Sequence, residues 1–361
     1  MTEANQQWRL ARVPPAGWPQ PEDYAWHTAP APQPDPGQAL ARTLYLSLDP
    51  YQWGRRRRGI ERPGDVCHGR AVAQVVASRH AEYAEGDFVF TPLGWQRVGL
   101  TGDGIDHFGY MFPRRLDPAV APISAAVGVL GMLGLTAYAG LIVQCDPRPG
   151  ETVVVSAASG GVGQVVAQLA RLKGCRVVGI TSTLAKCDYL HRELALDAVV
   201  SHLDDDFPAR LAAACPDGVD VYFESVGGAV YEAVLPHLNR GARISICGMI
   251  SQYGNTDGRD PAEVWMATGR PYFDRLDITP QRLFVGDYVA DHQERFLAEM
   301  AAWLRDGLVH YQEDVWPGLE SAPEAFAAML HGSNFGKTLV AVAEDPTRPD
   351  GAVRSRVQRF Y

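Results

Sequence analysis

Residues 152–186 constrain the fold more than any other segment, because they combine a buried strand, a glycine turn and a helix. Residues 153–155 are consecutive valines, as in a strand that is buried on both faces of a parallel sheet. The turn at 159–163 reads SGGVG, and apolar residues then recur at helical spacing. A second strand at 176–180 follows at the interval that a βαβ unit requires. The segment therefore predicts a βαβ unit in a parallel sheet.

The glycine turn indicates a dinucleotide site, because bare N–H groups at a helix N-terminus bind a diphosphate. The alternative is a βα turn whose small residues serve only packing. An NAD site usually has Asp or Glu after the second strand. This chain has residues 181–183 (TST) there, with Lys186 just beyond. Hydroxyls and an ammonium bind a 2′-phosphate, so the sequence predicts NADP(H). The alternative for Lys186 is an ordinary solvated lysine.

Composition sets further bounds on the class of protein. A chain of 361 residues, 46% of them hydrophobic, can bury ample core and is expected to form two domains. A net charge of −9 argues against nucleic acid as a partner. The six scattered cysteines suit free thiols in the cytoplasm, and no secretory signal is expected. Residues 119–145 carry no charge, but their proline and glycines favour two short buried helices over a membrane span.

The pattern of predicted secondary structure changes near Gly150. Before it, a proline-rich extended stretch and short strand-like runs predict a small β-barrel-like domain. After it, strands and helices alternate. Residues 254–280 are rich in Gly, Pro and Asp, and we expect a long loop near a site. The expected strands are 41–48, 70–77, 87–91, 95–100, 219–224, 242–247 and 338–342, and the expected helix is 292–306.

Several strings carry a family resemblance. They are 46–51 (LSLDPY), 131–138 (GMLGLTAY), 159–163 with 173–179, 222–228 (YFESVGG), 247–253 (CGMISQY) and 332–338 (GSNFGKT). In this order they resemble the zinc-independent medium-chain dehydrogenase/reductase superfamily, in its leukotriene B/prostaglandin reductase and 2-alkenal (double-bond) reductase branch. The resemblance implies an α/β fold class: a GroES-like β-barrel domain plus a doubly wound Rossmann-type parallel-sheet domain. It implies a substrate domain at 1–127, an NADP-binding domain at 128–298 and a C-terminal return with a tail at 299–361.

The same resemblance implies which residues bind the cofactor. It implies Ser159, Gly160, Gly161 and Val162 at the diphosphate, Lys186 at the 2′-phosphate, His202 near the adenosine, Cys247 and Tyr253 along the nicotinamide ribose, Phe284, Val285 and Gly286 beside the nicotinamide, and Asn334 from the C-terminal return. Ser225 is a further implied cofactor contact, at a position where many relatives have Asn. Core packing is the alternative for Phe284 and Val285, and a turn asparagine is the alternative for Asn334.

Two tyrosines are the candidate catalytic residues. Hydride transfer to the β-carbon of an enone leaves negative charge on the carbonyl oxygen, which a hydrogen-bond donor stabilises. Tyr253 is the first candidate donor and Tyr51 the second. Trp53 and Arg55 are expected to contact substrate; the run 55–58 (RRRR) either binds a substrate carboxylate or phosphate or is a solvated loop.

No metal is expected, because zinc-dependent relatives have a Cys and a His-Glu pair. Here Cys67 and His68 are followed by Gly69, and a catalytic zinc needs three protein ligands.

The resulting hypothesis is NADPH-dependent reduction of the C=C bond of an enone or enal. The alternatives are a quinone reductase, a carbonyl/alcohol oxidoreductase and a catalytically silent NADPH-binding protein. The expected partner is a small α,β-unsaturated carbonyl, with no nucleic acid and no membrane, and relatives suggest a homodimer. The natural substrate, the hydride face and the role of the C-terminal tail do not follow from the sequence.

Overall fold

The computed structural model describes residues 4–348 and 357–360, and the chain divides into two compact units. Unit 1 comprises residues 1–132 and 312–359, and unit 2 comprises 133–311 with 360–361. The domain boundaries predicted from the sequence were at residues 128 and 299. Position 299 lies inside helix α8 (Val289–Arg305), and the continuity of this helix keeps the whole of it in unit 2.

Unit 1 is built on an eight-stranded sheet with the order β16-β14-β15-β3-β4-β5-β7, in which β6 pairs with β3. A separate antiparallel pair, β1 with β2, forms within the first 30 residues, and most prolines of this part of the chain lie outside the two strands. The bounds are β1 (Ala4–Leu10), β2 (Tyr24–Pro30), β3 (Gln38–Ser47), α1 (Tyr51–Arg57), β4 (Ala71–Ser78), β5 (Phe88–Thr91), β6 (Val98–Gly102), β7 (Arg114–Leu116), β14 (Tyr311–Pro317), α9 (Ala322–Leu330), β15 (Lys337–Ala341) and β16 (Val357–Phe360).

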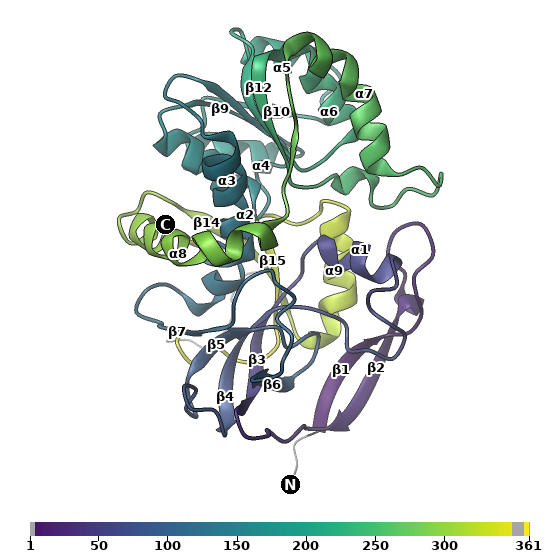
Figure 1. Ribbon diagram of the computed structural model, residues 1–361, viewed down its shortest axis with the longest axis vertical. Coiled ribbons are helices and arrows are strands. Elements are labelled where there is room, and N and C mark those ends of the chain that lie inside the picture. Colours follow the sequence, from purple (N-terminus) through teal and green to yellow (C-terminus); the bar gives the residue numbers. More distant parts are fainter. Residues whose placement is uncertain (1–3, 349–356, 361) are drawn as a thin grey trace. The chain divides into compact units, whose positions relative to one another are not determined.

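Unit 2 is a doubly wound parallel sheet with the order β10-β9-β8-β11-β12-β13 and helices on both faces (Figure 1). Every pairing in it is parallel. This confirms the predicted fold class. The bounds are β8 (Thr152–Val155), α3 (Gly163–Leu172), β9 (Arg176–Thr181), α4 (Leu184–Asp188), β10 (Ala198–Ser201), α5 (Phe207–Ala214), β11 (Val219–Glu224), α6 (Gly228–Val234), β12 (Leu238–Ile246), α7 (Pro261–Leu276), β13 (Gln281–Arg282) and α8.

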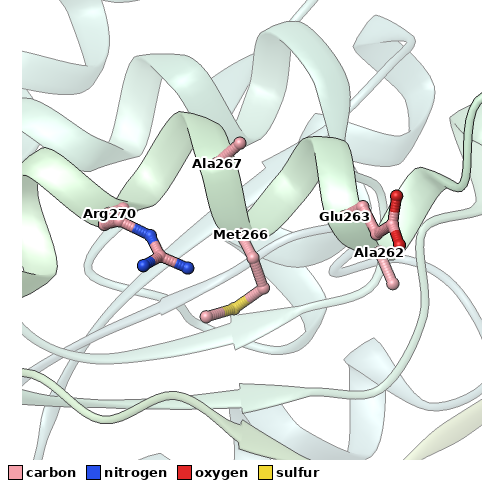
Figure 2. A pocket seen from close by; sticks show the side chains of 5 residues that line it. All are labelled: Ala262, Glu263, Met266, Ala267 and Arg270. Carbon is pink, nitrogen blue, oxygen red and sulfur yellow. The ribbon is translucent and has the colours of Figure 1, made fainter.

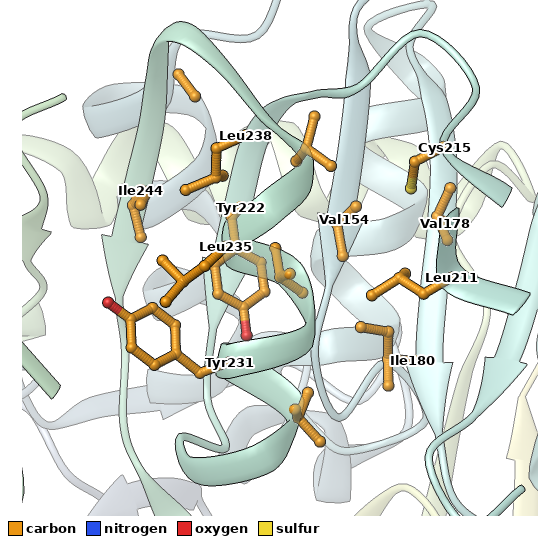
Figure 3. Close-up of a cluster of buried hydrophobic side chains, with 14 of the residues drawn as sticks. Val154, Val178, Ile180, Leu211, Cys215, Tyr222, Tyr231, Leu235, Leu238 and Ile244 are labelled. Atoms are coloured by element: carbon orange, nitrogen blue, oxygen red, sulfur yellow. The ribbon is translucent and has the colours of Figure 1, made fainter. Parts of the chain in front are cut away.

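The core of unit 2 forms where apolar side chains of the strands meet those of the covering helices. Figure 3 shows Val154 and Val178 from neighbouring strands with Leu211 and Tyr231 from α5 and α6. The valine run of β8 is wholly buried, as predicted for a strand covered on both faces. This rigid core holds the ends of the strands in place.

The prediction of a long loop at 254–280 was wrong, because residues 261–276 form helix α7. The side chain of Asp260 accepts a hydrogen bond from the N–H of Ala262, and Pro261 occupies the first helical position. Trp265, Gly269 and Phe273 are the buried residues of α7 and recur every four positions. This stripe was visible in the sequence, but the glycines, prolines and aspartates around it suggested a loop.

The uncharged stretch 119–145 is helical in short pieces, as predicted. A 3-10 helix spans Ile123–Val127, and α2 (Met132–Ala137) continues into a π-helical segment at Tyr138–Cys145. In the part of the chain that the structure describes, no helix combines the length and apolar character needed to cross a membrane.

Candidate active site

The residues predicted to bind the cofactor in unit 2 share one edge of the sheet. The strands are parallel, so their carboxyl ends meet at one edge, and chain order reverses between β8 and β11. Ligands of doubly wound sheets bind at such a switch point. The predicted residues follow the strand ends directly: Ser159, Gly160, Gly161 and Val162 after β8, Lys186 after β9, His202 after β10, Ser225 after β11, Cys247 and Tyr253 after β12, and Phe284, Val285 and Gly286 after β13.

The turn after β8 is tightly folded. Ala157 has a left-handed backbone (φ 50°), and its carbonyl oxygen accepts a hydrogen bond from the N–H of Gly160 at 2.9 Å. A Cβ on Gly163 would overlap this same carbonyl oxygen. Glycine is therefore required where α3 begins, and the close approach leaves backbone N–H groups of the turn at the amino end of a ten-residue helix.

Hydroxyl groups and a cation gather at the end of β9. The Oγ of Ser159 lies 2.7 Å from Oγ1 of Thr181, and Lys186 donates to Oγ of Ser182 at 3.3 Å. Lys186 is only 8% exposed, so it is not the ordinary solvated lysine that the sequence left open as an alternative. Burial, and then the charge of Lys186, lower the pKa of His202, so His202 is neutral near pH 7 and leaves Lys186 as the cation of this group.

A buried carboxyl group shapes the loop after β11. Glu224 accepts hydrogen bonds from the N–H groups of Val226 and Gly227 and from Oγ of Ser156. The indole of Trp265 in α7 donates to it at 3.2 Å. Burial raises the pKa of Glu224, and the four donors hold the loop that carries Ser225. Helix α7 thus fixes the strand end from which a cofactor contact was predicted.

The segment after β12 brings Cys247 and Tyr253 to the same loop as Ser225. The N–H of Cys247 donates to the carbonyl oxygen of Glu224 at 2.8 Å, and burial raises the pKa of the Cys247 thiol to about 12. It is therefore a protonated thiol at neutral pH. A Cβ on Gly248 would lie 3.1 Å from the phenol oxygen of Tyr253, so the half-buried phenol folds back over its own loop.

The residues after β13 differ in exposure. Phe284 is 45% exposed, so core packing does not account for it, whereas Val285 is 6% exposed. Large exposed aromatic side chains beside a strand end suit a flat ligand such as a nicotinamide ring. Their predicted roles stay predictions, with Phe284 the better placed of the two.

In unit 1, Tyr51 lies in a group of polar and aromatic side chains. It is the first residue of α1; its phenol oxygen accepts a hydrogen bond from Nη1 of Arg70 and lies 2.7 Å from Nε2 of His68. Burial, and then the charges of three arginines, lower the pKa of His68 well below its usual value, so the imidazole is neutral at pH 7. The ring of Tyr110 packs on Tyr51, with 4.7 Å between centroids, and that of Phe108 on His68 at 4.5 Å.

The arginine run belongs to α1 and its C-terminal end, and is not a loop. Arg56 is wholly buried, with Nε 3.2 Å from Oε2 of Glu61 and its guanidinium over the ring of Trp95. Arg55 is nearer the surface, 3.8 Å from the same carboxylate and over the ring of Phe108. Arg56 is therefore a structural cation, and Arg55 remains a candidate for substrate contact.

Two predicted residues of unit 1 have local structural partners. Trp53 is 1% exposed, packs against Phe326 and donates its indole N–H to the carbonyl oxygen of Gly17 at 3.1 Å. It is a core residue, because no surface of it is left to meet a substrate. Asn334 donates to the carbonyl oxygen of Gly336 at 2.9 Å, which is the turn role weighed as its alternative.

The expectation of no metal concerns Cys67 and His68. Burial raises the pKa of the Cys67 thiol to about 12, and His68 already contacts Tyr51. Among the described residues, no three His, Cys, Asp or Glu side chains are grouped to hold a metal ion. The absence of a metal nevertheless stays a prediction.

A hollow in unit 2 lies outside this group of residues. It is lined by residues of α7 alone, and Figure 2 shows Met266 between Glu263 and Arg270 on one face of the helix. None of the residues predicted to bind the cofactor lines it.

Two family models match the chain. The model described as the N-terminal domain of oxidoreductase matches residues 6–106, and the one described as zinc-binding dehydrogenase matches residues 161–275. The NADPH-dependent curcumin reductase of Escherichia coli is 41% identical over 352 residues, covering 95% of this chain and 98% of that relative. The chain belongs to the medium-chain dehydrogenase/reductase superfamily. Within it, the relatives identify the zinc-independent double-bond reductase branch.

Further relatives agree with this branch of the superfamily. The NADP-dependent 2-alkenal reductase of Nicotiana tabacum is 36% identical, covering 85% of this chain and 88% of that relative. The crystal structure of CurA from Vibrio vulnificus in complex with NADPH has a TM-score of 0.85 and 40% identity, and the match covers 94% of this chain and 100% of CurA. The predicted family and fold are confirmed.

Sequence reasoning missed several residues that the reductase fold brings to Tyr51 and to the end of β11. His68 was considered only as a metal ligand, and neither Arg70 nor Tyr110 was considered. Arg70 could have been noticed, because it is a charged residue immediately before the buried strand β4. Tyr110 lies in a loop far along the chain, so only the fold reveals its contact with Tyr51.

Proposed function

We propose that the chain catalyses NADPH-dependent reduction of the C=C bond of an α,β-unsaturated carbonyl, an enone or enal, by hydride transfer to the β-carbon. The observation that carries the proposal is the buried cation Lys186 at the end of β9 in a sheet of dinucleotide-binding order. The relatives named curcumin reductase and 2-alkenal reductase, and the NADPH complex of CurA, support this chemistry.

The residues present fit NADPH. A bound NADPH would supply the hydride, which is the difficult part of the chemistry. Gly161 and Val162 of the turn offer N–H groups to the diphosphate, and Lys186 with Ser182 offers charge and a hydroxyl to the 2′-phosphate. Phe284 with Val285 and Gly286 would flank the nicotinamide ring. His202, Ser225, Cys247 and Asn334 complete the proposed contacts.

Two phenols are the proposed catalytic groups. Negative charge develops on the carbonyl oxygen when the β-carbon accepts hydride, and a phenol O–H donates to that oxygen at neutral pH. Tyr253 is proposed as the first donor and Tyr51 as the second. Arg55 is the proposed contact for an acidic group on the substrate, and Trp53 supports α1 through the core.

Assembly and location are part of the same proposal. We propose a homodimer and a cytoplasmic location; the scattered free cysteines support the location only. Light scattering on the purified chain measures the assembly, and a monomer at micromolar concentration would contradict the dimer.

The test is turnover of NADPH with a panel of enones, quinones and simple ketones, with products identified by mass. We expect oxidation of NADPH with enones and a saturated carbonyl product. Turnover confined to quinones or to saturated ketones would favour the other oxidoreductase classes. Binding of NADPH without turnover of any substrate would favour a silent binding protein.

A further inference from the structure

Arg70 is a buried cation that has no carboxylate partner among the residues that the structure describes. Its side chain is 1% exposed, its Nη1 donates to the phenol oxygen of Tyr51, and its guanidinium lies 4.5 Å from the centroid of the Tyr110 ring. None of the ion pairs within residues 4–348 includes it, and its buried Nη2 has no hydrogen-bond partner there. Burying a charge without a counter-ion costs several kcal/mol of folding free energy. An arginine at this position is therefore expected to have a function.

The neighbouring cations of unit 1 are paired. Arg56 is equally buried, but it lies 3.2 Å from the carboxylate of Glu61. Lys337 lies 2.8 Å from Asp49 and donates to the carbonyl oxygen of Leu48. Carboxylates therefore neutralise Arg56 and Lys337, whereas Arg70 has a neutral phenol as its main polar partner. Arg70 is thus positioned to stabilise negative charge that arises at Tyr51.

The phenol is held from two directions. Arg70 is always a donor, so it occupies one lone pair of the Tyr51 oxygen. His68 lies 2.7 Å from the same oxygen and is neutral at pH 7, so it adds a hydrogen bond without adding charge. Charge-assisted hydrogen bonds are shorter and stronger than neutral ones, and a phenol that accepts one becomes a stronger donor in turn.

We propose that Arg70 is a positioning residue of the reductase, which holds and polarises the phenol of Tyr51 so that Tyr51 donates to the enolate oxygen of the substrate. The inference rests on the proposed function and deepens it. Hydride adds to the β-carbon, the π electrons move to the carbonyl oxygen, and the phenol O–H donates to that oxygen. The α-carbon then takes its proton from water, so the overall reaction consumes one NADPH and one proton.

The experiment is a double-mutant cycle on Tyr51 and Arg70, with 4-phenylbut-3-en-2-one as substrate at saturating NADPH. In Arg70→Met we expect kcat to fall by about 30- to 100-fold while KM changes by less than about 3-fold, because the lost interaction acts in the transition state. In the Tyr51→Phe background the same substitution should lower kcat by less than about 3-fold, because its effect passes through the phenol.

Conservative and matched variants separate this role from a structural one. Arg70→Lys keeps the charge, and we expect it to restore most of the kcat lost in Arg70→Met. Arg62→Met makes the same chemical change at an exposed residue outside the proposed site and should leave kcat unchanged. If Arg70→Met does not fold, Arg70→Lys is measured in both backgrounds. Its smaller loss should disappear in Tyr51→Phe.

The two proposals fail in different ways. Absence of turnover with the wild-type chain would overturn the proposed function. With an active wild type, an equal loss in kcat from the Arg70 substitution in both backgrounds would overturn the role of Arg70 alone. A Tyr51→Phe variant with full kcat would also overturn it, because no phenol would then be available to act through.

Discussion

One side chain, that of Lys186, accounts for the predicted preference for NADPH over NADH. Its ammonium is buried beside Ser182. Burial is the larger cause of the lowered pKa of His202, and the charge of Lys186 lowers this pKa further. An ammonium binds a phosphate through charge-assisted hydrogen bonds, and the 2′-phosphate of NADPH would accept them from Lys186. The same side chain has nothing comparable to bind in NADH.

Replacing Lys186 with Ala should therefore weaken NADPH far more than NADH. A hydrogen bond to a charged group contributes about 1.5–3 kcal/mol, so the dissociation constant for NADPH should rise roughly 10- to 150-fold. Isothermal titration with both coenzymes measures it. Lys173→Ala, at an exposed lysine of the same unit, is the control and should change neither constant. Parallel losses for the two coenzymes would contradict the assignment.

Tyr253 is the residue on which the proposed chemistry depends most. Tyr253→Phe removes only the hydroxyl, so we expect kcat with an enone to fall about 100- to 1,000-fold, as when one donor to an oxyanion is lost. The dissociation constant for NADPH should stay within about 2-fold, because the ring remains. Steady-state kinetics and coenzyme titration measure the two effects. An unchanged kcat would exclude Tyr253 as the donor.

At the scale of elements, α7 shows where sequence reasoning fails. Pro271 lies inside this helix, and residues 254–260, which precede the helix, include two glycines. A loop was therefore expected. The helix forms because its buried stripe packs on α6: Tyr231 stacks on Trp265, with ring centroids 4.3 Å apart. Tertiary packing outweighs local propensity here. The strands of unit 2 were predicted well, because continuous β-branched runs have few other structures open to them.

Gly269 marks the closest approach of α7 to its neighbours. A Cβ there would overlap the phenol oxygen of Tyr231 and the ring of Phe273. Gly269→Ala should therefore lower the free energy of unfolding by about 1–3 kcal/mol. The matched control is Gly54→Ala in α1, where a Cβ meets only ordinary contacts with Arg58 and alanine favours the helix. Urea unfolding of both variants checks this. A neutral Gly269→Ala would show that α7 packs more loosely.

At the scale of the whole molecule, the stability of the chain should depend on a buried carboxyl group of β14. Burial raises the pKa of Glu313 from 4.5 to about 7, although Lys337 and Arg348 act to lower it and Asp345 to raise it. The folded state therefore holds a proton that the unfolded state loses between pH 4.5 and 7. Stability falls as pH rises through this window.

Glu313→Gln should remove this dependence, because the amide stays neutral at every pH. We expect the Tm of the variant, relative to wild type, to be higher at pH 8 than at pH 5 by a few degrees. Differential scanning calorimetry at the two pH values gives the comparison. A difference of Tm that is the same at both values would show that Glu313 is ionised in the folded state throughout.

At the candidate active site, the sequence predicted where residues lie along the chain better than it predicted which side chains contact one another. The motifs placed the cofactor residues after strand ends, and the sheet order brings those ends to one edge. Contacts between distant segments could not be predicted: the pairing of Tyr51 with Arg70 joins α1 to the start of β4, and Trp265 reaches Glu224 across 41 positions. The burial of Trp53 was missed for the same reason. Adjacent residues in sequence gave no sign of which side of α1 meets the core.

The most direct test of the central claim follows the hydride itself. The wild-type chain is given NADPH deuterated at C4 of the nicotinamide, in separate samples for the two faces, with 4-phenylbut-3-en-2-one. We predict a saturated ketone that carries deuterium at the β-carbon from one of the two samples. An allylic alcohol with deuterium on the carbinol carbon, or the absence of any deuterated product from either sample, would contradict the account.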